Sequence, residues 1–364
     1  MESLEREELN LEQPTTKTET VKCDGCGSNM TFNPETQKLY CEHCGSTKEL
    51  QNVVDAMEKD LVEGFVEEND WEEDKTVVFS CDNCGAKVVM PKGSTASNCP
   101  FCGTSHVQES SELAGLKPNA VIPFAISEEQ GKEKVKAWAK RKLYAPKKFK
   151  KDLQSENFKG VYTPCFTFDS RTTSYYDGVV GDRHTRVVGS GNNRRTETYI
   201  VWRRISGIYN DFFDDILVAA GSKINQQQIN KLSPYSTNSS KGYQEEYLLG
   251  FMAYKHDQDI KSCWEKAKGT MDNALRKRIL SQYHYDVLQY LNVSTTHEDV
   301  TFKYVMLPAY VGNFKFKKKL YNFYVNGETG KITGKTPVSA GKVLATVFSA
   351  LAVVGGVVAI LLLL

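Results

Sequence analysis

Hydrophobic and polar positions are distributed very unevenly between the two ends of the 364-residue chain. Residues 343–364 form a run of 22 residues without a charge. As a helix rising about 1.5 Å per residue, this run would measure roughly 33 Å, which is enough to cross a hydrocarbon core of about 30 Å. Buried core helices of this length rarely stay apolar on every side. The pattern therefore predicts a single transmembrane helix at 343–364 that acts as a tail anchor.

The charges that flank this run predict its orientation. Upstream of it, Glu328 is outnumbered by basic residues, namely Lys315, Lys317, Lys318, Lys319, Lys331, Lys335 and Lys342. Because basic flanks stay on the cytoplasmic side, we expect a single-pass protein of the cell membrane with the bulk of the chain in the cytoplasm. Small residues within the span could support self-association through the helix, although such residues are common in membrane spans.

Between 113 and 334 the pattern alternates between strand-like and helix-like periods. Alternating or continuous apolar runs predict strands at 160–168, 172–180, 183–188, 196–208, 300–310, 312–319 and 320–325. Helical patterns cover 127–143, 223–231 and 258–283, and Ser127 with Gln130 forms a capping-box pair at the start of the first. No regular βαβ alternation is present, so we predict an α+β cytoplasmic domain at 113–334.

Eight of the ten cysteines form two matching sets. The first set is Cys23, Cys26, Cys41 and Cys44, and the second is Cys81, Cys84, Cys99 and Cys102. Each cysteine of the second set follows its counterpart by 58 residues, and a glycine follows every CxxC pair, so the arrangement is an internal duplication. Two thiolates two residues apart can hold one ion from a tight turn, and two such turns complete a tetrahedral four-sulfur site that suits Zn²⁺.

We therefore predict two zinc ribbons, small β modules at 21–50 and 76–110, with two structural Zn²⁺ ions. Since all four ligands of each site are thiolates, the sites are closed and structural rather than catalytic. Disulfides or thioredoxin-like redox centres are the rival interpretation, which a reducing cytoplasm and the paired layout disfavour.

Charge limits what the ribbons bind. The chain holds 46 Lys and Arg against 45 Asp and Glu, which excludes a chain that coats nucleic acid by charge alone. Neither ribbon carries a basic stripe, whereas residues 1–20 form an acidic tail predicted to be disordered, and 51–75 form an acidic linker that is either a short amphipathic helix or a solvated spacer. The ribbons therefore favour protein partners, and nucleic acid is an unlikely ligand.

No catalytic constellation is evident, so we predict no catalytic residues, no cofactor-binding residues and no enzyme activity. The histidines are scattered, and the adjacent carboxylates Asp214 and Asp215 would point in different directions, which makes a poor acid–base pair. Residues 132–151 form a strongly basic segment, which either lies on anionic lipid or packs on the domain by its apolar side.

Several segments carry a family resemblance. Besides the CxxC pairs, they are residues 141–146 (RKLYAP), 160–169 (GVYTPCFTFD), 202–207 (WRRISG), 213–218 (FDDILV), 247–251 (YLLGF), 307–310 (LPAY) and 325–330 (VNGETG). On these motifs the chain resembles the bacterial TFIIB-type zinc-ribbon membrane proteins. The resemblance implies an envelope-stress setting, with a PspA-type protein, an SPFH-domain protein and a second membrane protein as partners.

The leading hypothesis is a membrane-anchored adaptor that docks partner proteins at the cytoplasmic face of the membrane. The alternative is a nucleic-acid-binding zinc-ribbon protein tethered to the membrane, in replication or transcription. It would use the ribbons and the basic segment at 132–151, and its affinity would fall steeply with salt.

Overall fold

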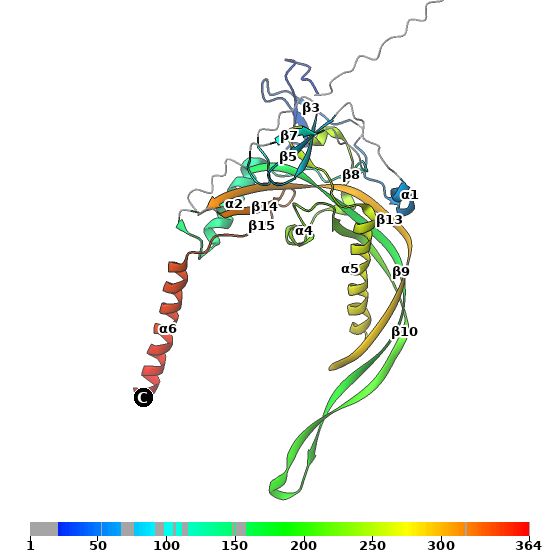
Figure 1. Ribbon diagram of the computed structural model, residues 1–364, viewed down its shortest axis with the longest axis vertical. Coiled ribbons are helices and arrows are strands. Elements are labelled where there is room, and N and C mark those ends of the chain that lie inside the picture. The colour runs from blue at the N-terminus through cyan, green and yellow to red at the C-terminus, as the bar shows by residue number, and fades with distance from the viewer. Residues whose placement is uncertain are drawn as a thin grey trace, which may run out of the picture.

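The computed structural model describes residues 21–51, 53–66, 76–91, 98–104, 107–110, 116–147, 149, 158–316 and 319–363. The acidic tail expected at 1–20 lies outside the described residues, as does part of the acidic linker. The architecture is mixed α+β, with two sheets and few helices (Figure 1).

The smaller sheet belongs to the first set of cysteines. Its antiparallel strands are β1 (Thr31–Asn33), β2 (Lys38–Tyr40) and β3 (Thr47–Lys48). We call residues 21–50 the first cysteine module. The second cysteine module, residues 76–110, contributes β5 (Thr76–Cys81), β6 (Lys87–Pro91) and β7 (Val107–Ser110), and these strands belong to the larger sheet.

The larger sheet has twelve strands among the described residues. Its three long strands are β9 (Phe158–Val188), β10 (Arg195–Ala219) and β13 (Val287–Phe316). The short ones outside the second module are β4 (Lys59–Asp60), β8 (Ala120–Val121), β11 (Lys241–Gly242), β12 (Met252–Tyr254), β14 (Lys319–Asn326) and β15 (Ile332–Gly334). β9 is antiparallel to β10 along one edge and to β13 along the other.

The strand boundaries predicted for this region were wrong. The runs at 172–180 and 183–188 lie in one continuous strand with 160–168. The run at 300–310 and residues 312–316 lie in β13, which begins at Val287, whereas Lys319 already belongs to β14. The alternation is interrupted because polar residues occupy positions where the strands leave the core. A 3-10 turn, η1 (Gly191–Asn193), joins β9 to β10.

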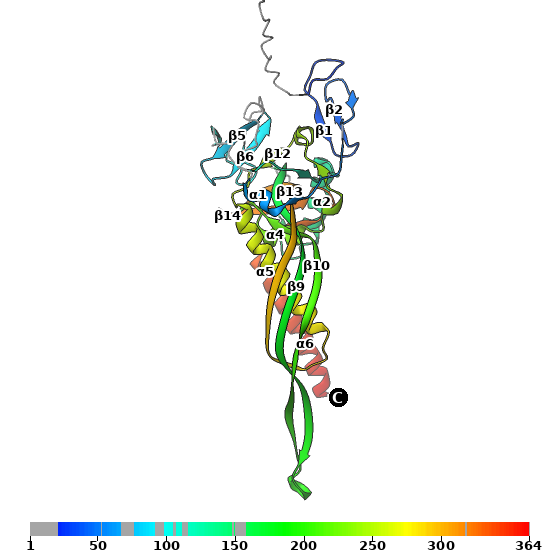
Figure 2. The same ribbon diagram turned by 90° about the vertical axis from the view of Figure 1, so that its right-hand side faces the viewer.

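The long strands extend far beyond the core, and we call residues 170–213 and 287–298 the arm (Figure 1). Its inner face packs on α5 (Ile260–Ser281), whose buried side chains are Ile260, Cys263, Trp264, Ala267, Met271, Leu275 and Ile279. Its outer face, opposite α5, faces the viewer in Figure 2. Near the body the arm is therefore a sheet with one face covered, whereas the β9–β10 hairpin at 183–204 extends beyond α5 (Figure 1).

The remaining helices follow local signals. α2 (Glu128–Arg141) begins with the predicted capping box, since the Ser127 hydroxyl accepts from the Gln130 amide and the Gln130 side chain accepts from the Ser127 amide. The others are α1 (Leu61–Val66), α4 (Gln226–Leu232), α6 (Ala340–Leu363) and the 3-10 turns η2 (Thr237–Ser239) and η3 (Glu245–Leu248). α1 shows that part of the acidic linker is helical.

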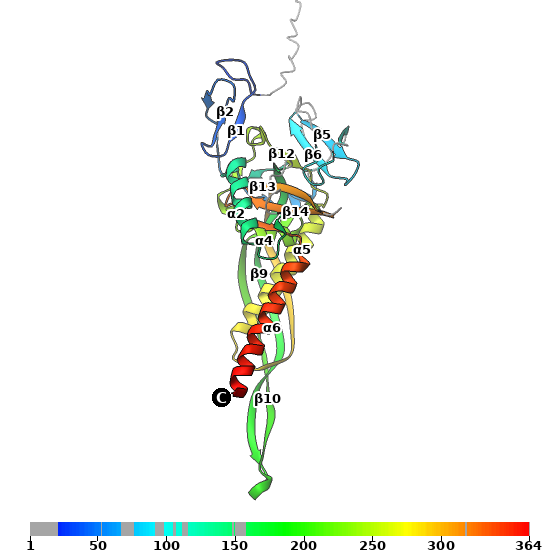
Figure 3. The same cartoon turned by 90° about the vertical axis from the view of Figure 1, so that its left-hand side faces the viewer.

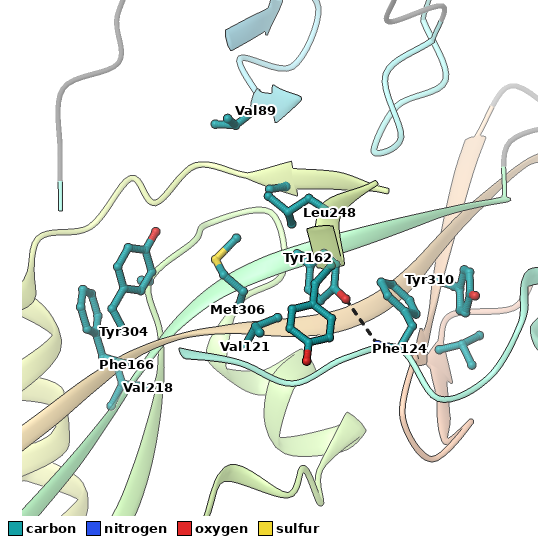
Figure 4. Close-up of a cluster of buried hydrophobic side chains, with 14 of the residues drawn as sticks. Val89, Val121, Phe124, Tyr162, Phe166, Val218, Leu248, Tyr304, Met306 and Tyr310 are labelled. Atoms are coloured by element: carbon teal, nitrogen blue, oxygen red, sulfur yellow. Dashed lines mark hydrogen bonds between the residues drawn. The ribbon is translucent and has the colours of Figure 1, made fainter. Parts of the chain in front are cut away.

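The core lies where β8, β9 and β13 meet (Figure 4). Phe124 stacks on Phe251 with 4.1 Å between ring centroids, and its amide donates to the hydroxyl of Tyr162. Tyr310 donates its hydroxyl to the carbonyl of Ile126 at 2.7 Å. These buried tyrosines fill the core while their hydroxyls satisfy backbone groups.

The cysteine modules and the C-terminal helix lie far apart. Both cysteine modules lie at one end of the body, whereas α6 and the arm extend to the opposite side (Figures 1 and 3). α6 is long and apolar enough to cross a membrane, and its segment Ala340–Val358 is not buried against the rest of the chain.

Two glycine substitutions test the pairing of β9. A Cβ on Gly178 would lie 2.7 Å from the carbonyl oxygen of Tyr290, beside the β-bulge of β13, so Gly178→Ala should lower the free energy of unfolding by about 1–3 kcal/mol. Gly269, in α5, has open space around it, so Gly269→Ala should raise stability by about 0.5–1 kcal/mol. Denaturant unfolding measures both, and equal effects would contradict the register.

Candidate metal centres and a buried ion cluster

The first cysteine module brings four thiols to one point. The Sγ atoms of Cys23 and Cys44 are 3.4 Å apart, and those of Cys26 and Cys41 are 3.5 Å apart. All four sulfurs lie within 4.8 Å of one another. A tetrahedral zinc with Zn–S bonds of about 2.3 Å places its sulfurs about 3.8 Å apart, so this group is compatible with one zinc ion.

The second cysteine module repeats this geometry. Here the Sγ atoms of Cys81 and Cys102 are 3.6 Å apart, and those of Cys84 and Cys99 are 3.7 Å apart. After each CxxC pair, the glycine that follows has a positive φ, as the sequence predicts, with φ of 72° at Gly27, 76° at Gly45, 69° at Gly85 and 74° at Gly103. The chain thus builds two four-cysteine groups by the same local device.

Local hydrogen bonds favour the thiolate at several of these sulfurs. The backbone of Gly25 and Cys26 lowers the pKa of Cys23. Burial would raise the pKa of Cys102, but the Thr104 backbone and the Asn83 side chain outweigh it and lower that pKa to about 7. Since four thiolates so close together repel one another, a divalent cation is the chemistry that fits each group.

The two modules are attached to the body differently. In the first, the Phe32 amide donates to the carbonyl of Leu249 at 2.9 Å, and the Phe32 ring meets Tyr247 edge-on at 5.3 Å. In the second, β6 pairs with β12, and β12 pairs in parallel with β9. The second module is therefore part of the large sheet, whereas the first packs against the body with a sheet of its own.

The remaining cysteines and His43 lie outside these groups. Cys165 and Cys263 are both fully buried, as expected for small core residues, and burial raises the pKa of Cys263 to about 11. His43 lies between Cys41 and Cys44 and is exposed. Neither four-cysteine group draws on these three residues.

A buried ion cluster lies where the arm joins the body, and sequence reasoning missed it. The Nζ of Lys303 is 2.8 Å from Asp215 and 3.0 Å from Glu58. The Thr301 hydroxyl donates to Glu58 at 2.9 Å, and the Asp215 amide donates to Asp169 at 2.6 Å. The side chains of Lys303 and Asp215 are only 6% and 5% exposed, so this amine and its carboxylate depend on each other.

Two β-bulges create the cluster. In β10 the register shifts between Phe213 and Ile216, with Asp215 at φ 50°, and in β13 it shifts between Glu298 and Thr301. The shift in β10 lies opposite Asp169 of β9, and the shift in β13 lies opposite the neighbouring Ser170. The lone lysine in the apolar run at 300–310 was the one signal of this site in the sequence, since a strand rarely buries an unpaired amine.

The pKa values of Asp169 and Glu58 are shifted in opposite directions. Burial, together with Glu58 and Asp215, raises the pKa of Asp169 to about 7. The hydrogen bond with Asp169 and the contact with Lys303 lower the pKa of Glu58 to about 2. Burial disfavours the Lys303 ammonium, but the two carboxylates outweigh it and raise its pKa. Although Glu58, Asp169 and Asp215 lie close enough to share a metal, the Lys303 amine already supplies their positive charge.

The fold and these sites define a protein with two four-cysteine groups, a mixed α+β body and one C-terminal helix apolar enough to cross a membrane. The chain is 30% identical over 330 residues to the uncharacterized protein YdjG of Bacillus subtilis (strain 168), an alignment that covers 90% of this chain and 92% of the relative. The chain therefore belongs to the YdjG family. No protein-family model and no solved structure matches it.

Metal content should distinguish the two cysteine modules. We expect about two zinc equivalents per chain, and about one in Cys41→Ser and in Cys99→Ser, by elemental analysis. Because the second module is continuous with the large sheet, Cys99→Ser should also lower Tm by roughly 5 °C or more, whereas Cys41→Ser should leave body unfolding nearly unchanged. Equal Tm losses would contradict the different attachments, and full zinc in either variant would contradict the ligand sets.

The buried ion cluster predicts a pH dependence of stability. The Asp169 carboxyl binds its proton more tightly in the folded chain, where its pKa is about 7, than in the unfolded chain, where it is near 4. Its contribution is therefore present at low pH and lost as pH rises from about 4 through about 7. We therefore expect the Tm of Asp169→Asn, measured relative to the parent chain at the same pH, to be higher at pH 8 than at pH 5.

Asp177→Asn, which removes an exposed carboxyl of the same strand, is the matched control and should leave the profile unchanged. Parallel Tm profiles for Asp169→Asn and the parent chain would show that the carboxyl titrates normally.

Proposed function

We propose that the chain is a membrane-anchored adaptor that docks partner proteins at the cytoplasmic face of the membrane, with two structural zinc ions that stabilise its modules. The observation that carries this proposal is the uncovered outer face of the arm. The arm is far longer than the core requires, and it leaves one side of a sheet without a covering layer (Figure 2). The proposal assigns the chain binding and no catalytic step.

The outer face of the arm carries large apolar side chains in solvent. Their exposed fractions are 57% at Tyr175, 44% at Trp202, 60% at Ile208, 58% at Phe212 and 40% at Tyr290. Ile208 and Tyr175 are directly paired in the register, and all five occupy positions of the same face by strand parity. Exposed apolar groups gathered on one face are typical of protein interaction surfaces.

The outer edge of β10 adds a second docking element. Over the arm, β10 pairs with β9 alone among the described strands, so its other edge presents unpaired backbone groups. Such an edge can accept a strand from a partner, with main-chain hydrogen bonds giving affinity and alternate side chains giving specificity.

The membrane anchor is supported by α6. From Leu344 to Val358 its side chains are exposed, uncharged and mostly apolar, a surface that water disfavours and lipid accepts. The lysines that precede α6 favour a cytoplasmic body. We also propose that the cysteine modules are TFIIB-type zinc ribbons, and that the partners include PspA-type and SPFH-domain proteins in an envelope-stress response. The resemblance of the motifs supports both.

Crosslinked capture from intact membranes, with nuclease present, tests the adaptor role. Ile208→Ser with Phe212→Ser should reduce the recovery of partner proteins several-fold, because it removes apolar area from the docking face. Truncation before Val343 should abolish recovery of membrane partners, because the chain leaves the bilayer.

Met57→Ser with Val62→Ser is the matched control, since it removes two side chains that are 81% and 68% exposed outside the arm. Equal recovery with the arm and control variants would contradict docking by the arm. Recovery of nucleic acid or replication proteins that nuclease removes would favour the nucleic-acid alternative instead.

A further inference from the structure

A basic cleft lies directly before the C-terminal helix. It has a volume of about 800 Å³ and is formed by α4, β14, β15 and the segment that leads to α6. Lys231 comes from α4, Lys319 from β14 and Lys335 from the leading segment. The cleft is therefore built from three separate parts of the chain, each of which supplies one amine.

The charge of this cleft is one-sided. No Asp or Glu is among the described residues that line it, and none of the three lysines forms an ion pair with a described carboxylate. Lys319 lies over the ring of Tyr321, 5.8 Å from its centroid. Amide and hydroxyl groups complete the lining, among them Gln228 and Thr336. Three amines with neutral hydrogen-bonding groups form a site whose natural ligand is an anion with several oxygen acceptors.

The position of the cleft selects the source of that anion. Val338 lines the cleft, α6 begins at Ala340, and the charge-free run begins at Val343. Even a fully extended chain covers only about 18 Å over those five residues. Whatever the tilt of α6, the cleft therefore stays close to the headgroup layer once the helix spans a bilayer.

We propose that this cleft binds the phosphate-bearing headgroup of an anionic phospholipid. Lys231, Lys319 and Lys335 would hold the phosphate oxygens, and the neutral groups would contact the rest of the headgroup. This inference rests on the membrane anchoring proposed above. The apolar helix α6 alone would not distinguish one phospholipid from another, whereas the cleft would select an anionic one. A bound headgroup would fix the body relative to the leaflet at a second point.

Lipid selectivity of the full chain tests the site. The protein is reconstituted in phosphatidylcholine vesicles with about one part in five phosphatidylglycerol and then extracted in mild detergent, and the copurifying lipids are quantified. We expect the three lysines to favour phosphatidylglycerol over phosphatidylcholine by about tenfold. The ratio of phosphatidylglycerol to phosphatidylcholine that copurifies with the protein should then be well above the ratio in the vesicles. The variant Lys231→Gln/Lys319→Gln/Lys335→Gln should return the ratio to that of the bulk.

Lys22→Gln/Lys38→Gln/Lys48→Gln is the matched control, because it makes the same charge change on the first cysteine module, at the far end of the body. It should keep the enrichment. Unchanged enrichment in the cleft variant would overturn the proposal. Loss of enrichment in millimolar inorganic phosphate would assign the cleft to a soluble anion and overturn the lipid assignment.

Vesicle flotation separates this inference from the anchoring on which it rests. A full chain that floats with vesicles but shows no lipid enrichment contradicts the cleft site alone. A full chain that fails to float contradicts the membrane anchor itself. Zinc content, measured on each variant, verifies that the cysteine modules remain folded.

Discussion

The pairing of β9 along both of its edges is the constraint on which the structure depends. A 31-residue strand exposes many backbone groups, and β10 and β13 satisfy them on either side. The same strand enters the core beside β12 and so connects the second cysteine module to the arm. Body, module and arm are therefore parts of one hydrogen-bonded sheet, and a change in one edge of β9 reaches the others.

The two bulges opposite Asp169 and Ser170 divide this sheet into two environments. On the body side, β9 is buried on nearly every residue, whereas on the arm side its exposure alternates. At that boundary the bulges interrupt the hydrogen-bond ladders between the strands. The interior there holds the ion pair of Lys303 with Asp215 rather than packed apolar side chains. A buried ion pair of this kind contributes little net stability but tolerates few alternative arrangements, so it favours one register.

Local signals in the sequence predicted much of the site and less of the fold. The four-cysteine groups, the glycines with positive φ, the capping box of α2 and the C-terminal helix all follow from short spacings, and the structure contains each of them. The length of β9 and β13, the union of the second module with the large sheet, and the buried ion cluster were missed. Each depends on residues that are far apart in the sequence, such as the ion-paired Lys303 and Glu58. Local patterns of hydrophobic and polar residues do not specify which distant segments pair.

The arm and α6 leave the body on the same side, and this has a consequence for geometry at a membrane. The arm tip carries Arg183, Arg186, Arg194 and Arg195, which are too costly to place in hydrocarbon. With α6 in a bilayer, the arm must therefore stay outside the hydrocarbon, alongside the leaflet. The part of β9 that lies in the arm, residues 170–188, spans roughly 60 Å, so the arm would reach a wide area of membrane around its tether. Partners confined to the same surface would meet it at a raised effective concentration without any added affinity.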